Sequence, residues 1–355
     1  MFSVSASSIN SFLSCRTQWY FSYVRGISLR GFTSALVRGT VAHEMIDVAL
    51  TMRKNSPSNI APPSICCENE QVKRVIQDRF DETKKTSLFG SFDEDKFWEA
   101  VNKGKEIASY FIDEVLPTLD WEILAVEVPF ENNRIESNRK TSIKGRIDAV
   151  VRTGNHLVVV DHKTYNHIPN PSRVSMDLQL PFYLAMLCES TTQFTPNSDL
   201  EMFRKHQDKE VFAPAIMMNV ISTSLPEPPR VLKSGKISKD KSQRTTKAMY
   251  MQALRDRGLD TDPSYLAIAE GFDDSRYAQQ LWDFPSKEKL EWVWNMAAIA
   301  SSEMKDIVEA PETLPCNAYN CSHCGYQSLC TDMRNKGQTP DVIKPDTLLY
   351  SVKEK

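Results

Sequence analysis

The spacing of apolar residues predicts strands in the middle of the chain and helices before and after them. Alternating or continuous apolar runs predict strands at 121–130, 142–152, 157–163 and 213–222. Amphipathic runs predict helices at 3–30, 34–54, 172–189 and 286–309, with further charged helices between residues 68 and 116. The order helix, three strands, helix, strand is typical of a mixed α/β sandwich, in which helices flank a central sheet.

The second and third of these strands form a predicted hairpin that brings two carboxylates together. A Gly-Asn step at 154–155 separates the strands, and such a step between β-rich runs predicts a tight turn. Pairing Thr153 with His156 across this turn places Asp148 directly opposite Asp161, with both side chains on one face of the sheet. Two carboxylates in that arrangement repel one another, so the pair requires a neutralising partner.

A divalent cation and a neighbouring lysine are the partners that this pair predicts. Lys163 lies two residues after Asp161 and therefore shares its face of the sheet. Carboxylates and carbonyls are the ligands that Mg²⁺ prefers, and an imidazole shifts the preference toward Mn²⁺. Such a cation lowers the pKa of bound water, while a lysine holds the water and the phosphate. The pattern therefore favours metal-dependent hydrolysis of phosphodiesters.

Residues on two predicted helices add candidates to this site. His43 is either a metal ligand or a structural histidine paired with Asp47, four residues later. Gln179 and Tyr183, also four residues apart, share one helix face, and they either support the site or stabilise a helix–sheet contact. The backbone carbonyl of His162, between the aspartate and the lysine, is a further potential ligand.

The order of these motifs resembles that of a known family. Gly39-x3-His43, Gly145-x2-Asp148, Asp161-x-Lys163-Thr164 and Gln179-x3-Tyr183 are similar to the motifs of RecB-like nucleases of the PD-(D/E)XK superfamily. The resemblance covers most of residues 3–222. It implies a restriction-endonuclease-like core with the order αβββαβ, a mixed central sheet and flanking helices.

The resemblance also implies a role for each matching residue. The positions that match ligands of Mg²⁺ or Mn²⁺ are His43, Asp148 and Asp161. The positions that match catalytic or supporting residues are Lys163, Gln179, Tyr183 and, at the end of the first strand, Glu127. His162 departs from the Tyr, Phe or Trp that is common in relatives, which leaves the roles of its neighbours untouched.

The same resemblance organises the chain as a single nuclease domain over residues 1–355. The nuclease core would comprise residues 34–54 and 121–222. A helical insertion would occupy residues 55–116, and a basic loop with further helices would occupy residues 226–309. The two ends of the chain, residues 1–30 and 311–335, would form one joint region.

Cysteines near the C-terminus have the spacing of metal ligands. The motif Cys321-x2-Cys324-x5-Cys330 supplies three thiols within ten residues. A four-coordinate site needs one more ligand, and the residues alone leave Cys316, His323 and Cys15 as candidates. In a reducing compartment such cysteines are thiols or metal ligands rather than disulfides.

The resemblance favours Cys15 as the fourth ligand. An iron–sulfur subset of the family, which includes AddB-type nuclease domains and CRISPR-associated adaptation exonucleases, has one cysteine before the nuclease core and three after it. The resemblance therefore implies a [4Fe–4S] cluster on Cys15, Cys321, Cys324 and Cys330, which would join the two ends of the chain. A zinc ion on four cysteines is the alternative.

A basic segment at residues 230–247 is a candidate for DNA contact. It holds seven basic residues against one acidic residue. It is either a solvated loop or an arm that binds phosphates. The candidate contacts are Lys233, Lys236, Lys239, Lys241 and Arg244. The segment loosely resembles part of phage-encoded nucleases of this family.

Composition limits where this chemistry takes place. With 41% hydrophobic and 25% charged residues, the sequence is typical of a globular protein. The net charge of −3 gives no general attraction to nucleic acid, so DNA would bind in a local basic groove. The sequence has no apolar run of about 20 residues and no signal peptide pattern. We therefore expect a cytoplasmic location, in a bacterial or phage-infected cell, without a membrane partner.

The expected activity is that of a Mg²⁺- or Mn²⁺-dependent DNA exonuclease in recombination, repair or replication. Its substrates would be single strands or duplex ends, and a recombinase, helicase or single-strand-binding protein is a candidate partner. A structure-specific endonuclease is an alternative with the same motifs. A non-catalytic DNA-binding subunit of a repair or CRISPR-adaptation complex is a second alternative, which the intact Asp148, Asp161 and Lys163 disfavour.

Overall fold

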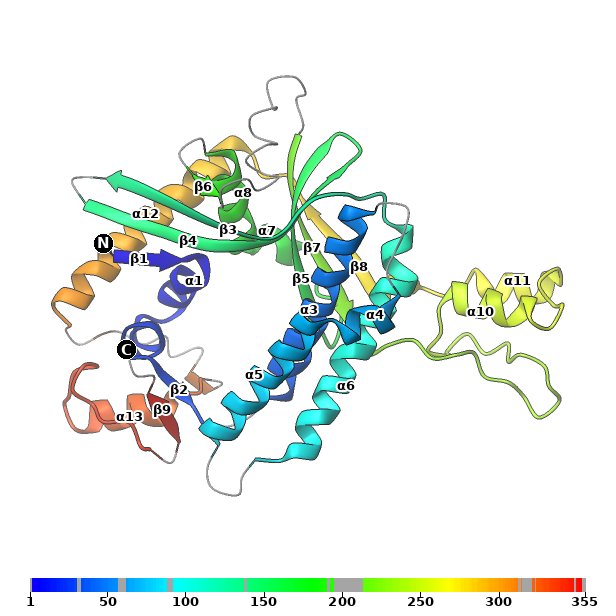
Figure 1. Cartoon of the computed structure of the whole chain (residues 1–355), viewed down its shortest axis with the longest axis horizontal. Helices are drawn as coiled ribbons and strands as arrows, with labels where there is room; N and C mark the ends of the chain where they lie inside the picture. Colours follow the sequence, from blue (N-terminus) through cyan, green and yellow to red (C-terminus); the bar gives the residue numbers. More distant parts are fainter. Residues whose placement is uncertain are drawn as a thin grey trace.

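A mixed sheet with helices on both faces forms the centre of the molecule (Figure 1). The structure, a computed structural model, describes residues 2–30, 33–56, 62–87, 92–136, 139–189, 192–194, 213–311, 314, 321–322, 324–347 and 349–352. Within these residues the sheet has seven strands in the order β6-β3-β4-β5-β7-β8, and β1 pairs with β4 beside this path.

The central strands follow the predicted hairpin. The strands of the sheet are β1 (Phe2–Ser5), β3 (Glu122–Glu136), β4 (Arg139–Thr153), β5 (His156–Tyr165), β6 (Gln193–Phe194), β7 (Ala213–Ser222) and β8 (Ala278–Asp283). Strands β3, β4 and β5 are antiparallel to one another, while β7 lies parallel to β5. The bounds of β7 agree with the prediction, and the other predicted strands extend by a few residues at their ends.

Separate sets of helices cover the two faces of the sheet. One face packs against α3 (Ser34–Asn55), α4 (Pro63–Glu68), α5 (Glu70–Thr86) and α6 (Glu94–Tyr110). The other face packs against α1 (Ala6–Ser14), α7 (Ser172–Met176), α8 (Gln179–Cys188) and α12 (Lys287–Glu309). In β5 the side chains alternate between these two cores, with Leu157 and Val159 toward α8, and Val158 and Val160 toward α3. None of the described helices combines the length and apolarity needed to cross a membrane.

The order α3, β3, β4, β5, α8, β7 confirms the predicted αβββαβ core. The prediction of one helix over residues 172–189 is wrong, because Asp177 separates α7 from α8. Its carboxylate oxygen Oδ1 accepts the backbone N–H groups of Gln179 at 2.7 Å and Leu180 at 3.0 Å. Satisfying these donors starts a new helix with Gln179 as its first residue.

The prediction of one helix over residues 3–30 is also wrong. The segment contains β1, α1, α2 (Arg16–Trp19), a π-helical turn η1 (Tyr20–Val24) and β2 (Ile27–Leu29). Strand β1 pairs in parallel with β4, and β2 pairs with β9 (Tyr350–Val352) near the opposite end of the chain. Both short strands depend on partners more than 100 residues away, so their local sequence does not reveal them.

Residues between β7 and β8 form a small lobe that stands apart from the sheet (Figure 1). It contains α10 (Lys247–Arg255), α11 (Pro263–Ala269) and the turn η5 (Asp274–Arg276). The lobe has its own apolar core, built around Tyr250, Tyr265 and Phe272. We name residues 226–276 the basic lobe, because it carries the basic segment identified in the sequence.

Helices α3 and α6 approach closely at Gly104. A Cβ atom at Gly104 would lie 2.7 Å from the backbone oxygen of Arg38 and 2.9 Å from the Cβ of Val41. A Cβ at Gly39 of α3 would meet only the Oγ1 of Thr164, at an ordinary 3.6 Å. Both glycines lie inside helices, where alanine is more favourable by roughly 0.5–1 kcal/mol. Alanine at the two positions should therefore have opposite effects.

We predict that Gly104→Ala lowers the free energy of unfolding by about 1–3 kcal/mol, because the added methyl group overfills the helix contact. Gly39→Ala should raise it by about 0.5–1 kcal/mol, since the methyl group has space and the unfolded chain loses freedom. Urea unfolding followed by circular dichroism measures both changes. Equal shifts in the two variants would contradict the close approach of α3 and α6.

Candidate active site

Strands β4 and β5 separate at the position of the two predicted aspartates. Their ladder runs from Thr153 and His156, the predicted first pair, to Ala149 and Val160, where it ends. Beyond that point β5 stays paired with β7, and residues 141–144 of β4 pair instead with β1. Residues 145–148 therefore lie between the two ladders without a partner strand on this side among the described strands. We call this opening the fork.

The regular alternation of side chains breaks at the fork. Val126 packs toward α3 and Val128 toward α8, although residues two apart normally share a face. On the paired strand, Ile147 packs toward α8 and Ala149 toward α3. Between the two valines, Glu127 has a φ of 50°, the one left-handed non-glycine residue among those described. Such a backbone costs about 1–3 kcal/mol and is typical of functional sites.

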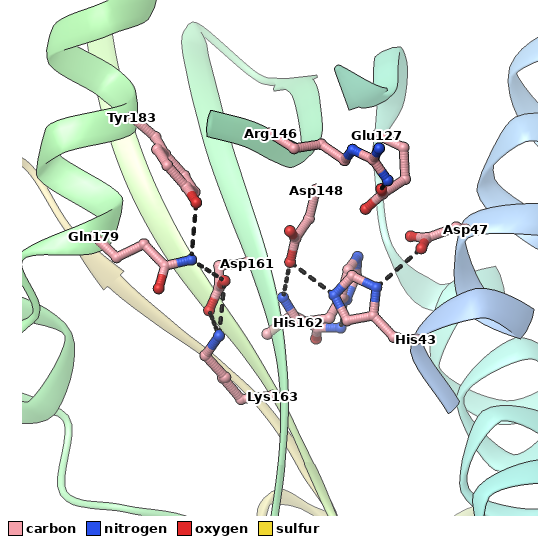
Figure 2. A network of polar contacts seen from close by, with 11 residues as sticks. His43, Asp47, Glu127, Arg146, Asp148, Asp161, His162, Lys163, Gln179 and Tyr183 are labelled. Atoms are coloured by element: carbon pink, nitrogen blue, oxygen red, sulfur yellow. Dashed lines mark hydrogen bonds and ion pairs between the residues drawn. The ribbon is translucent and has the colours of Figure 1, made fainter. Parts of the chain in front are cut away.

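The break turns the carboxylate of Asp148 toward α3 (Figure 2). Its Oδ2 atom lies 2.8 Å from Nε2 of His43 and accepts the backbone N–H of His162 at 3.1 Å. The other ring nitrogen of His43, Nδ1, lies 2.9 Å from Asp47. The prediction that Asp148 lies directly opposite Asp161, with both side chains on one face of the sheet, is therefore wrong. The ladder ends one pair earlier, and Asp148 turns toward α3 while Asp161 contacts Gln179 of α8. His43 and Asp148 are brought together, and Asp161 faces another group.

Opposite charges around His43 explain the ionisation of this part of the site. Burial alone would lower the pKa of His43, but its hydrogen bonds to Asp148 and Asp47 raise it to about 11. Burial also acts on Asp148, but the bond to His43 outweighs it and lowers the pKa of that carboxyl. Burial raises the pKa of Asp47 to about 7. In the absence of a cation, His43 is therefore an imidazolium between two carboxyl groups.

Asp161 forms the second half of the site with Lys163 and α8 (Figure 2). Both of its oxygens contact Nζ of Lys163, at 2.8 and 2.7 Å. Gln179 donates to Asp161 at 3.3 Å and to the hydroxyl of Tyr183 at 3.2 Å. The side chain of Asp161 is 4% exposed, and burial raises its pKa although Lys163 opposes this. The structure therefore places Lys163, Gln179 and Tyr183 next to Asp161.

Gly145 allows this packing. A Cβ atom there would lie 2.6 Å from the ring of Phe130 and 3.2 Å from the ring of Tyr183. The glycine of the Gly145-x2-Asp148 motif thus leaves room for an aromatic pair whose ring centroids are 5.7 Å apart. This contact positions Tyr183 at the fork.

The side chain of His162 lies on the face opposite to Asp161 and is held by a buried polar chain. Asn219 of β7 contacts Nδ1 of His162 at 2.8 Å and accepts from Gln280 of β8 at 2.9 Å. Because the amide oxygen of Asn219 is engaged, its NH₂ group donates to His162. Burial lowers the pKa of His162 to about 3, so the ring is neutral. The backbone of His162 remains at the fork, next to Asp148.

The donor set of the fork suits a hard divalent cation. Three ligand atoms, one each from His43, Asp47 and Glu127, lie within 4.8 Å of one another. One oxygen of Asp47, Oδ1, is buried and has no hydrogen-bond partner among the described residues. Glu127 pairs with Arg146 at 2.8 Å, and burial raises its pKa. Several carboxylates and few compensating cations fit Mg²⁺ or Mn²⁺ better than a soft metal.

Four residues of this network are not among the predicted site residues: Asp47, Arg146, Asn219 and Gln280. Asp47 was recognised as a possible partner of His43, and the sequence also shows Asn219 as a polar residue inside an apolar strand. A buried polar residue requires a hydrogen-bond partner, which is the signal that could have identified Asn219. The sequence gives no comparable signal for Arg146 or Gln280, since both depend on pairing between strands.

The predicted cluster cysteines gather near the N- and C-terminal segments. Cys15 follows α1, Cys321 and Cys324 lie in a turn, and Cys330 lies on α13 (Gln327–Asn335). Burial first, and then charge on Cys324, Cys15 and Cys321, together raise the pKa of the Cys330 thiol to about 12, so the four thiols lie close enough to interact. Cys316 and His323, the other candidate ligands, lie outside the described residues.

The basic lobe presents all five predicted DNA contacts at its surface. Lys233 and Lys236 flank a turn at Gly235, which has a φ of 78°. Lys239 lies 4.3 Å from the centre of the Tyr265 ring. The remaining two, Lys241 and Arg244, contact other parts of the lobe near Gly271 and Glu227. Lys233 and Lys236 are therefore best placed to meet a ligand in solution.

Comparison with known proteins identifies the family. The family model of the PD-(D/E)XK nuclease superfamily matches residues 3–331, nearly the whole chain. No curated protein matches the chain. The matched range includes the positions of all four motifs, and the αβββαβ core agrees with the family. The chain therefore belongs to the PD-(D/E)XK nuclease superfamily.

Proposed function

We propose that the protein is a Mg²⁺- or Mn²⁺-dependent exonuclease that hydrolyses DNA from single strands or duplex ends. Family membership already indicates a metal-dependent nuclease with DNA as its substrate. The observation that carries the proposal is the fork, which holds the pair of His43 with Asp148 and the pair of Lys163 with Asp161. The similarity of the ordered motifs to RecB-like nucleases supports the exonuclease activity. Recombination, repair or replication is the proposed setting, with a recombinase, helicase or single-strand-binding protein as candidate partner.

His43, Asp148, Asp161 and the backbone carbonyl of His162 would hold the cation. When bound, Mg²⁺ or Mn²⁺ supplies positive charge for the phosphoryl oxygens and lowers the pKa of a water molecule. Asp47 would fix the orientation of His43, because it engages Nδ1 and leaves Nε2 for the cation. Glu127 lies close enough to His43 and Asp47 to contribute a further carboxylate.

Lys163 would position the reacting groups. Its pKa is raised by the carboxylate of Asp161 although burial opposes this, so the ammonium group stays charged at neutral pH. A charged Nζ atom donates hydrogen bonds to the attacking water and to the scissile phosphate. Gln179 holds Asp161 toward Lys163, and Tyr183 supports Gln179 in turn.

The cysteines would bind a [4Fe–4S] cluster that joins the two ends of the chain. The proximity of Cys15 to Cys321, Cys324 and Cys330 supports this proposal. Thiolates are the ligands of iron–sulfur clusters, and these four cysteines match the number that a [4Fe–4S] cluster needs. A zinc ion on the four cysteines is the alternative.

The basic lobe would hold the DNA backbone near the active site. Strand β7 ends at Ser222, and Thr223 donates its backbone N–H to the carbonyl of Tyr165 at 2.8 Å. Tyr165 lies two residues after Lys163, so the lobe begins beside the catalytic end of β5. Lysines that extend from this point can neutralise phosphates of a strand bound at the fork.

We predict that Asp161→Asn and Lys163→Ala each lower the rate of Mg²⁺-dependent DNA degradation by at least about 10²–10³-fold. Each substitution removes charge from the site and leaves the β5–β7 ladder in place. Lys289→Ala is a matched control, because Lys289 forms a similar half-buried pair with Asp283 at 2.6 Å, away from the fork. Digestion of end-labelled DNA measures the rates. Wild-type rates in both variants would refute the assignment of the site.

We predict that the protein purified without oxygen is brown and contains about four irons per chain. Cys15→Ser should lose most of this iron, because three thiolates remain for a cluster that needs four. Cys188→Ser, which changes an exposed cysteine, should keep it. Metal analysis and visible absorption measure the outcome. A colourless protein that contains zinc would contradict the cluster.

We predict that the double variant Lys233→Ala, Lys236→Ala reduces the slope of log K against log salt for DNA binding by about one to two, since each lysine that contacts a phosphate releases about one counterion. The pair Lys84→Ala, Lys85→Ala, at the exposed end of α5, should leave the slope unchanged. Fluorescence anisotropy with labelled DNA gives the slope. A slope equal to that of the wild type would mean that the basic segment is a solvated loop that does not bind phosphates.

A further inference from the structure

A cavity of about 310 Å³ opens directly beside the candidate active site. His43 and Lys163 are among the residues that line it. The other walls come from the first half of α3 and the ends of β5 and β7, and they include Leu36, Gly39, Thr40, Ala42, Thr164 and Ile221. The cavity is thus continuous with the groups to which we assign phosphodiester hydrolysis.

The chemistry of these walls favours a neutral, flat and largely apolar ligand. Ala42 and Ile221 are fully buried and form an aliphatic floor, while Leu36 is 56% exposed at the mouth. The hydroxyls of Thr40 and Thr164 can each donate and accept a hydrogen bond. Apart from His43 and Lys163, the lining residues carry no charge. A second phosphate group would therefore be poorly solvated there.

The size of the cavity limits what it can hold. It lies at the lower end of the roughly 300–1,000 Å³ range of small-molecule sites. One ring system fits this space, and α3 forms one of its walls. A base in a duplex must also be unpaired and unstacked before it enters such a pocket. The cavity therefore selects a base that is already free.

We propose that this cavity receives one unpaired nucleobase of the strand that is cut, next to the scissile phosphate. The proposal rests on the proposed nuclease function and specifies its substrate as a strand with an unpaired base at the cleavage position. Leu36 would cover one edge of the ring at the mouth. The two hydroxyls can bond to any of the four bases, so binding tolerates different sequences.

The test compares substrates with and without a base. The substrates are single-stranded oligonucleotides that differ at one position. That position is the first or second nucleotide from the 5′ or the 3′ end, and it holds either a normal nucleotide or an abasic tetrahydrofuran residue. We expect wild-type protein with Mg²⁺ or Mn²⁺ to cleave beside the normal nucleotide at least about tenfold faster than beside the abasic residue. A tenfold difference in rate corresponds to about 1.4 kcal/mol of transition-state binding. Single-turnover rates measure this base preference.

Two variants then change the cavity itself. Gly39→Leu extends a side chain into the cavity toward Thr164, and we expect the base preference to fall to about one. Leu36→Ala removes an exposed contact at the mouth, so it leaves the core packing intact and should reduce the preference about threefold. Thr51→Leu enlarges an exposed side chain of α3 outside the cavity and should leave the preference unchanged. Circular dichroism confirms the folding of each variant.

The outcomes separate this inference from the proposed function. Wild-type protein that cleaves both substrates equally well overturns the base pocket and leaves the nuclease assignment standing. A folded Gly39→Leu variant that retains the full base preference overturns the pocket as well, as does a Leu36→Ala variant that slows both substrates equally. Wild-type protein that cleaves no DNA with either cation overturns the proposed function, and the pocket with it.

Discussion

The rest of the site depends on the separation of β4 from β5. Strand β5 is paired with β7 along its whole length, and β4 is paired with β3. On their facing edges, however, β4 and β5 share a ladder only near their turn. Where they part, backbone groups lose their ladder partners, and buried ones must find others. Asp148 supplies one, because its carboxylate accepts the N–H of His162. The same residue thereby stabilises the opening and places a carboxylate in it.

The fork brings buried carboxyl groups together, so a cation bound there would stabilise the native state. Asp47, Asp148 and Asp161 have side chains that are at most 13% exposed, with His43 and Lys163 as their main counter-charges. A cation on Nε2 of His43 would replace the proton that this ring otherwise carries. The neutralised aspartates would then no longer repel one another, so cation binding and folding stabilise each other. The left-handed backbone of Glu127 lowers the stability of the fold, and the contacts at the fork have to offset this loss.

Short-range features such as the hairpin turn could be predicted from the sequence, whereas the pairing of strands far apart in the sequence could not. The Gly-Asn turn predicted the pairing of Thr153 with His156, because a two-residue turn fixes the register. The predicted facing pair of Asp148 and Asp161 does not form, because the ladder ends at Ala149 and Val160. The prediction of a regular alternation of side chains is wrong at Glu127, because a glutamate in the sequence does not indicate a left-handed backbone. Strand β1 was missed because its partner in β4 is more than 130 residues away. The roles of the predicted ligands remain a prediction.

The two ends of the chain are connected to the fork by β1. This strand occupies the edge of β4 just beyond the opening, and α1 leads directly from it to Cys15. Cys15 neighbours three cysteines near the C-terminus, where Cys330 packs against Phe21 and Ile27. A group bound by these thiols would therefore fix the segment that contains β1, and with it one side of the fork. Such a group would act on hydrolysis by holding β4 apart from β5, at a distance from the reacting phosphate.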